Sequence, residues 1–197
     1  MFSTHGMDSL KKVAVLLVLI LVLISSINAQ TEDQVNAFKT LAEQGDVRAQ
    51  FALGFCYYSG KGVAKDDIEA IKWYRMAAEQ GNEEAQYAIG YCYENGTGCA
   101  QDNVEAVKWY RKAADQGQAD AQARLAFSLV TGEGVAQNLI EAYALLNLAG
   151  IENENAREAR SKLEKVLTSP QRDEGQRRTK ELQAEIKAKK SKLPASE

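Results

Sequence analysis

A stretch of 36 residues is written twice in succession, and this feature most restricts the fold of the 197-residue chain. Residues 46–81 align with residues 82–117 without a gap, and 20 of the 36 positions are identical. Residues 118–153 form a third, degenerate copy, and residues 30–45 match only the end of a unit. Self-similarity at a fixed period of this length is typical of solenoid arrays, in which each unit packs mainly against its neighbours in the sequence.

Each unit has the pattern of two helices separated by a turn that contains glycine. Over residues 49–57, apolar side chains recur at steps of three and four, the spacing of one buried helical stripe. Gly60 and Gly62 follow, and glycine ends helices readily because it tolerates positive φ. A second stripe covers residues 68–78. Since one helix pair cannot bury its apolar side alone, we predict an all-α fold, a right-handed α-solenoid of antiparallel helix pairs.

The residues themselves resemble a known repeat. Residues 49–63 read A-x-x-x-L-G-x-x-Y-x-x-G-x-G-V, and the string D-x-x-E-A-x-x-W-Y-x-x-A-A-x-x-G then ends at Gly81. The second copy follows the same pattern with Cys99 in place of the valine. This pattern resembles the Sel-one-like repeat family, a relative of the tetratricopeptide repeat. The resemblance implies a scaffold that grips a partner protein along the concave face of its first helices. It also implies an alternative, because some secreted cysteine-rich members bind or hydrolyse β-lactams.

Candidate partner-binding residues lie on the first helix of each unit. An aromatic residue occurs once per unit at one position: Phe55, Tyr91 and Phe127. Since the resemblance places first helices on the concave face, we expect these aromatics to form a ladder that anchors a partner. The alternative interpretation is packing between adjacent first helices. Five positions upstream, a glutamine recurs that we expect to add adaptable polar contacts on a nearby surface. These residues are Gln50, Gln86 and Gln122.

Three cysteines raise the question of a disulfide. Cys56 and Cys92 occupy the same position in successive units, where a free cysteine behaves as a small apolar residue. Cys99 lies seven residues beyond Cys92, across the turn. Secreted proteins meet oxidising conditions, so we predict Cys92–Cys99 as a candidate disulfide that leaves Cys56 unpaired.

The first 29 residues have the pattern of an export signal. Lys11 and Lys12 precede an apolar run over residues 13–24, and Ala29 provides a small residue before Gln30. This order predicts a signal peptide over residues 1–29, cleavage after Ala29, and a mature protein in the periplasm or outside the cell without a stable membrane anchor. The alternative is an uncleaved anchor, although the apolar run is shorter than the roughly 20 residues that span a bilayer.

The charge and composition of the exported chain exclude several classes of function. Cleavage would remove Lys11, Lys12 and Asp8, so the net charge would change from −3 to −4, which argues against nucleic acid as a partner. His5 is the only histidine and leaves with the signal. The mature chain then lacks the imidazole that Ser-His and Cys-His nucleophiles and most zinc sites use. It also lacks a Walker loop, G-x-S-x-G and S-x-x-K. We therefore predict a protein or peptide as partner, no cofactor, no metal and no catalysis.

The remaining segments are expected to support the array. The Trp-Tyr pairs at residues 73–74 and 109–110 lie on second helices, where such aromatics usually form core between repeats. Residues 154–175 are expected to form capping helices, because a helical pattern precedes Ser169-Pro170, a typical helix start. Residues 176–197 are expected to form a charged, solvated helix that ends in a disordered Pro-Ala-Ser-Glu tail.

Overall fold

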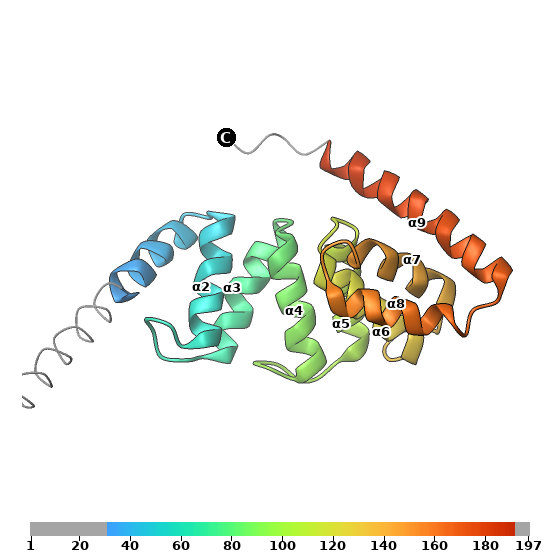
Figure 1. The fold of residues 1–197 in the computed structure, drawn as a ribbon. Coiled ribbons are helices and arrows are strands. Elements are labelled where there is room, and N and C mark those ends of the chain that lie inside the picture. Colours follow the sequence, from blue (N-terminus) through green and yellow to red (C-terminus); the bar gives the residue numbers. More distant parts are fainter. Residues whose placement is uncertain (1–30, 192–197) are drawn as a thin grey trace, which may run out of the picture.

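The computed structural model describes residues 31–191, and within this range the chain is helical and contains no strand. The predicted all-α helical repeat solenoid is confirmed: helix pairs follow one another in chain order (Figure 1). The predicted signal peptide over residues 1–29 and the predicted tail over residues 194–197 lie outside the described residues.

Three helix pairs correspond to the three units, and one further helix covers residues 31–43 before them. The pairs are α2 (Val47–Ser59) with α3 (Asp67–Glu79), α4 (Glu83–Asn95) with α5 (Asn103–Ala114), and α6 (Ala119–Thr131) with α7 (Leu139–Ala149). Two helices follow, α8 (Glu154–Glu164) and α9 (Ser169–Lys190). The second helix of each pair also packs on the first helix of the next pair, so that the units are joined as well as internally packed.

The turns inside the units are fixed by glycine. Gly96 ends α4 with a φ of 67°, and its N–H donates to the carbonyl oxygen of Cys92. Gly98 has a φ of 71°, and a Cβ there would lie 2.1 Å from the carbonyl oxygen of Asp67 in the preceding unit. Each such turn therefore rests against the backbone at the start of the previous second helix, where no side chain fits.

The core runs through the array as a repeated set of apolar side chains. Leu53, Ile89 and Leu125 take the same place in α2, α4 and α6, and all three are fully buried. Trp109 and Tyr110 are both buried, as expected for an aromatic pair between repeats. Trp73 is only partly buried and packs against the apolar cluster that contains Val35 and Leu53. Burial of these repeated positions supplies the main force that holds one unit to the next.

The C-terminal segment differs from the prediction. The expected boundary between capping helices and a separate charged helix at residue 175 falls inside α9, which continues from Ser169 to Lys190. This helix packs along α7, with Gly175 against the ring of Tyr143 and Leu182 buried. Most side chains of residues 176–190 are exposed, as expected for a charged, solvated helix. This half of α9 is nevertheless continuous with the cap and docks on it through Leu182.

Among residues 31–191, no helix combines the length and the apolar character that crossing a membrane requires.

Candidate functional site

The three predicted ladder aromatics lie on the first helices α2, α4 and α6. Phe55 is 49% exposed and Phe127 is 53% exposed, which is unusual for side chains of this size. Tyr91 is half-buried, because Arg124 lies over its ring at 5.7 Å from the ring centroid. The ladder therefore offers two open rings and one that is partly covered by the chain itself.

Each ladder residue borders an apolar hollow in the surface. Phe55 borders a hollow of about 290 Å³ between the helix over residues 31–43 and α2. Phe55 and Tyr91 share a second hollow of about 310 Å³ between α2 and α4. Phe127 borders a third, of about 320 Å³, between α6 and α8. The first-helix face is thus a row of apolar depressions, which is the kind of surface that receives the side chains of a partner.

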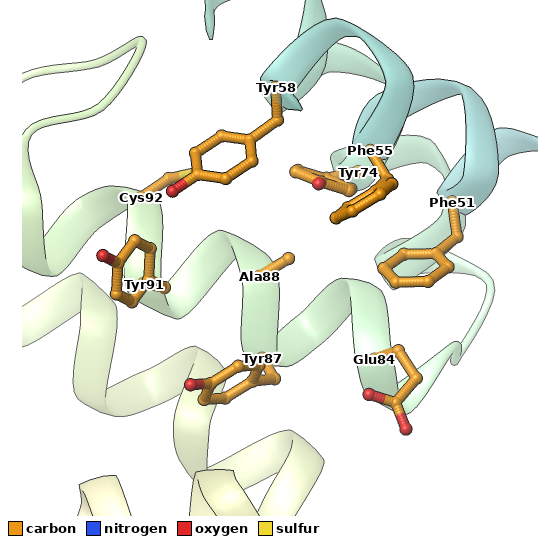
Figure 2. Close-up of a pocket in the computed structure, with 9 residues that line it drawn as sticks. All are labelled: Phe51, Phe55, Tyr58, Tyr74, Glu84, Tyr87, Ala88, Tyr91 and Cys92. Atoms are coloured by element: carbon orange, nitrogen blue, oxygen red, sulfur yellow. The ribbon is translucent and has the colours of Figure 1, made fainter. Parts of the chain in front are cut away.

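The hollow between α2 and α4 is here named the aromatic pocket. Figure 2 shows Phe51, Phe55 and Tyr58 on α2, with Ala88 between Tyr87 and Tyr91 on the facing α4. The complete lining is Phe51, Phe55, Tyr58, Tyr74, Glu84, Tyr87, Ala88, Tyr91 and Cys92. Six of these nine residues are aromatic and one is a carboxylate, so the walls offer π faces with a single negative charge at one end.

Burial controls the pKa values of the tyrosine hydroxyls that line the aromatic pocket. Burial raises the pKa of the Tyr58 hydroxyl, and the adjacent Tyr91 hydroxyl adds to the increase through a side-chain hydrogen bond. Burial also raises the pKa of Tyr74 far above its ordinary value. The hydroxyls of Tyr58 and Tyr74 therefore stay protonated and neutral over the physiological range.

The sequence had not singled out several of these lining residues. Phe51 and Tyr58 lie one helical turn before and after Phe55 on α2, and Tyr87 precedes Tyr91 by one turn on α4. Their spacing of three and four residues puts them on the same helix face as the ladder, and this spacing was the signal available in the sequence.

The repeated glutamines do not lie at the surface, and their predicted role there is corrected. Gln50 is buried; its Nε2 donates to the carbonyl oxygen of Ala42 at 3.2 Å, and its Oε1 accepts from Gln80 Nε2 at 2.7 Å. The next units repeat the first of these bonds. Gln86 donates to Ala78 at 3.0 Å, and Gln122 donates to Ala114 at 3.3 Å. The glutamines thus satisfy backbone carbonyls at the ends of the preceding second helices, so a partner cannot use them without breaking these bonds.

The cysteines are free thiols in the structure, so the candidate Cys92–Cys99 disulfide is not present there. Cys92 is buried at the floor of the aromatic pocket, and Cys99 packs against the same core cluster. Burial, followed by the charge of a Cys99 thiolate, raises the pKa of the Cys92 thiol to about 12. Thiol oxidation proceeds through the thiolate, so this environment slows pairing. Oxidation of the pair in an exported protein stays a prediction.

Over residues 31–191, no cluster of three or more histidine, cysteine, aspartate or glutamate side chains is arranged to hold a metal ion.

Comparison with known proteins agrees with the repeat geometry. The family model of the Sel1 repeat matches residues 47–82, 83–118 and 119–152. These matches cover more than half of the chain, so the protein belongs to the Sel1 repeat family. Proteins of this family typically act as scaffolds that bind other proteins.

Solved structures include similar arrays. A Sel1 repeat protein from Oxalobacter formigenes is 36% identical, covers 66% of this chain and 98% of its own, and superposes with a TM-score of 0.61. The protective antigen c5321 of uropathogenic Escherichia coli is 24% identical and covers 83% of this chain but 44% of its own, with a TM-score of 0.58. Cysteine rich protein B of Helicobacter pylori is 18% identical, covers 67% of this chain and 96% of its own, and has a TM-score of 0.53. The last two likenesses support the fold alone. A search of curated proteins gives no significant match.

Proposed function

We propose that this protein is an exported, non-catalytic scaffold that binds a segment of another protein along its first-helix face. The observation that carries the proposal is the exposure of Phe55 and Phe127, each at an apolar hollow and each in the same place in its unit. Exposed aromatic side chains beside pockets are typical anchors of protein interfaces. Membership of a family of interaction scaffolds supports the same function.

Export is proposed from the sequence over residues 1–29. Mass spectrometry of the protein from its native cell should find a mature chain that begins at Gln30 in the envelope or culture fraction. A chain that keeps residues 1–29 and sediments with membranes would instead support the anchor. The β-lactam alternative gains no support from the described residues.

The experiment for the binding face removes its two open anchors. In the variant Phe55→Ala with Phe127→Ala, we expect capture of the cross-linked partner from the native envelope to fall at least about tenfold, because hot-spot aromatics commonly contribute more than 1 kcal/mol each. The matched control is Ile68→Ala with Val104→Ala, which removes two equally exposed apolar side chains from the second helices. Equal capture by the first variant and the wild type would show that the first-helix face is not the interface.

A further inference from the structure

The three units can be compared position by position at one site on the first helices. Residues 52, 88 and 124 are equivalent, since each is 36 positions after the last, and they are alanine, alanine and arginine. The same alignment relates Phe51, Phe55 and Tyr58 of α2 to the residues of α4 in the same places. These are Tyr87, Tyr91 and Glu94.

Between α4 and α6, the chain fills the space above its aromatics with Arg124. The guanidinium Cζ lies 5.7 Å from the centroid of the Tyr91 ring, and Nη1 lies 3.2 Å from Glu94 Oε2. It also interacts with the hydroxyl of Tyr87. Burial opposes the charged form of Arg124, but Glu94 and the neighbouring tyrosine groups outweigh that effect and raise its pKa. A cation on this aromatic surface is therefore stable.

The first two units place the aromatic rings at the back of these spaces in the same way. The rings of Phe51 and Tyr74 are 5.7 Å apart at 35°, and the equivalent rings of Tyr87 and Tyr110 are 5.8 Å apart at 36°. Between α2 and α4, however, the residue equivalent to Arg124 is Ala88, whose methyl group leaves the space open (Figure 2). The aromatic pocket is this open space, about 310 Å³ in volume.

We propose that the aromatic pocket receives the guanidinium group of an arginine side chain from the bound partner segment, in the place that Arg124 fills one unit later. This inference rests on the proposed function and adds to it the chemistry of one anchor. The Phe55 ring, equivalent to Tyr91, supplies the π face on which the cation stacks. Tyr58 and Tyr91 line the pocket, and although their hydroxyls are hydrogen-bonded to each other, each oxygen keeps a lone pair that can accept from the N–H groups of the guanidinium.

The charges around the pocket suit a cation. Glu84 lies in its wall and takes part in no ion pair that the structure records. Two cations of the chain lie near, and each has its own carboxylate: Arg124 pairs with Glu94, and Lys65, 5.6 Å from the Tyr58 ring centroid, lies 3.4 Å from Asp67 Oδ1. Glu84 Oε2 accepts one long hydrogen bond, from Gln118 Nε2 at 3.4 Å, and no cation of the described chain neutralises the carboxylate in the recorded ion pairs. Its charge is therefore available to attract the arginine, at the end of the pocket opposite Tyr58 (Figure 2).

The first test compares peptides that differ in one side chain. The probes are acetyl-Ala-Ala-Arg-Ala-Ala-amide and the same peptide with citrulline, a neutral isostere of arginine, or with norleucine, an apolar side chain. NMR titration of the wild-type protein should show tyrosine ring shifts and an affinity about tenfold higher for arginine than for citrulline, the size of a favourable cation–π contact. Equal affinity for the arginine and citrulline peptides, or tighter binding of norleucine, would overturn the inference.

The second test fills the aromatic pocket with an arginine side chain of the protein itself. Ala88→Arg copies the residue of the third unit and should abolish the preference for the arginine peptide, while circular dichroism and thermal unfolding stay close to those of the wild type. Ala52→Arg adds the same charge at the equivalent position one unit earlier. Ala52 does not line the aromatic pocket but lines the neighbouring hollow between the helix over residues 31–43 and α2, so this variant should keep the preference. If Ala52→Arg loses the preference to the same extent, added charge is the cause and the inference fails.

Capture of the native partner by the two variants distinguishes a failure of this inference from a failure of the proposed function. If Ala88→Arg lowers partner capture as strongly as the Phe55→Ala with Phe127→Ala variant, the partner uses the aromatic pocket. If only the phenylalanine variant loses the partner, the face is the interface but arginine recognition is wrong. If neither variant loses it, the proposed function fails as well, whatever the peptides show.

Discussion

At the scale of single residues, the contact between Gly90 and Tyr110 shows how closely the two helices of a unit approach. A Cβ at residue 90 would lie 2.6 Å from two ring carbons of Tyr110 and 3.2 Å from the carbonyl oxygen of Ala106. In the third unit, the equivalent pair is Ala126 and Leu146. The chain thus changes both partners together: the larger helix residue occurs where the aromatic ring is absent.

This pairing gives a prediction for Gly90→Ala. Overpacking against the Tyr110 ring costs about 1–3 kcal/mol, and the better helix propensity of alanine returns ~1 kcal/mol, so we expect a net loss of roughly 0–2 kcal/mol in the free energy of unfolding. Adding Tyr110→Leu copies the third unit and should make the double variant more stable than the sum of the single effects predicts. Chemical denaturation followed by circular dichroism measures this coupling, and strict additivity would contradict it.

The residue scale is also where the sequence was least informative. A glutamine recurs at the position of Gln50 in every unit. A surface residue and a residue that bridges two helices would both recur in this way, so the sequence does not distinguish the two roles. Only the structure shows the amide of Gln50 bonded to Ala42 and Gln80. The aromatic pocket was missed for another reason: it depends on a small residue, Ala88, and becomes visible in the sequence only when that position is compared with Arg124 of the next unit.

At the scale of helices, α9 is the element whose position the sequence did not reveal. The helices within the units were predictable, because their apolar residues keep a helical period and glycines mark their ends. In α9 the apolar side chains are sparse, and its docking depends on Gly175, which lets the Tyr143 ring of α7 come close to the α9 backbone. Packing of that kind leaves little trace in a hydropathy pattern.

The contact of α9 with α7 gives a second prediction. Leu182 is 7% exposed and belongs to the cluster that covers α7, so Leu182→Ala should lower the free energy of unfolding by about 2–4 kcal/mol. Gln183→Ala, one position away on the exposed side, should change it by less than about 0.5 kcal/mol. Thermal and chemical unfolding of the two variants measure the difference. Similar values for both would mean that the charged half of α9 does not stay docked in solution.

At the scale of the whole molecule, the array is a row of units in which each helix pair contacts its neighbours and little else. The stability of such a chain is approximately a sum of unit terms and nearest-neighbour terms. The two ends of the array differ in how deeply their helices are buried. The helix over residues 31–43 buries Val35 and Ala42 and leaves most of its other side chains exposed, whereas α7 is buried between α6, α8 and α9.

This asymmetry predicts a gradient of local opening. Amide hydrogen exchange should be slowest in the buried helices α4, α5 and α7 and fastest in the helix over residues 31–43, because that helix opens without exposing the rest of the core. In the Leu182→Ala protein, exchange should become faster in α7 and α8, while α2 keeps its wild-type rates, since nearest-neighbour coupling carries the effect only part of the way along the array. Mass spectrometry of exchanged peptic fragments resolves these segments. Uniform protection from α2 to α9, or equal acceleration everywhere in the variant, would mean instead that the units fold as one cooperative block.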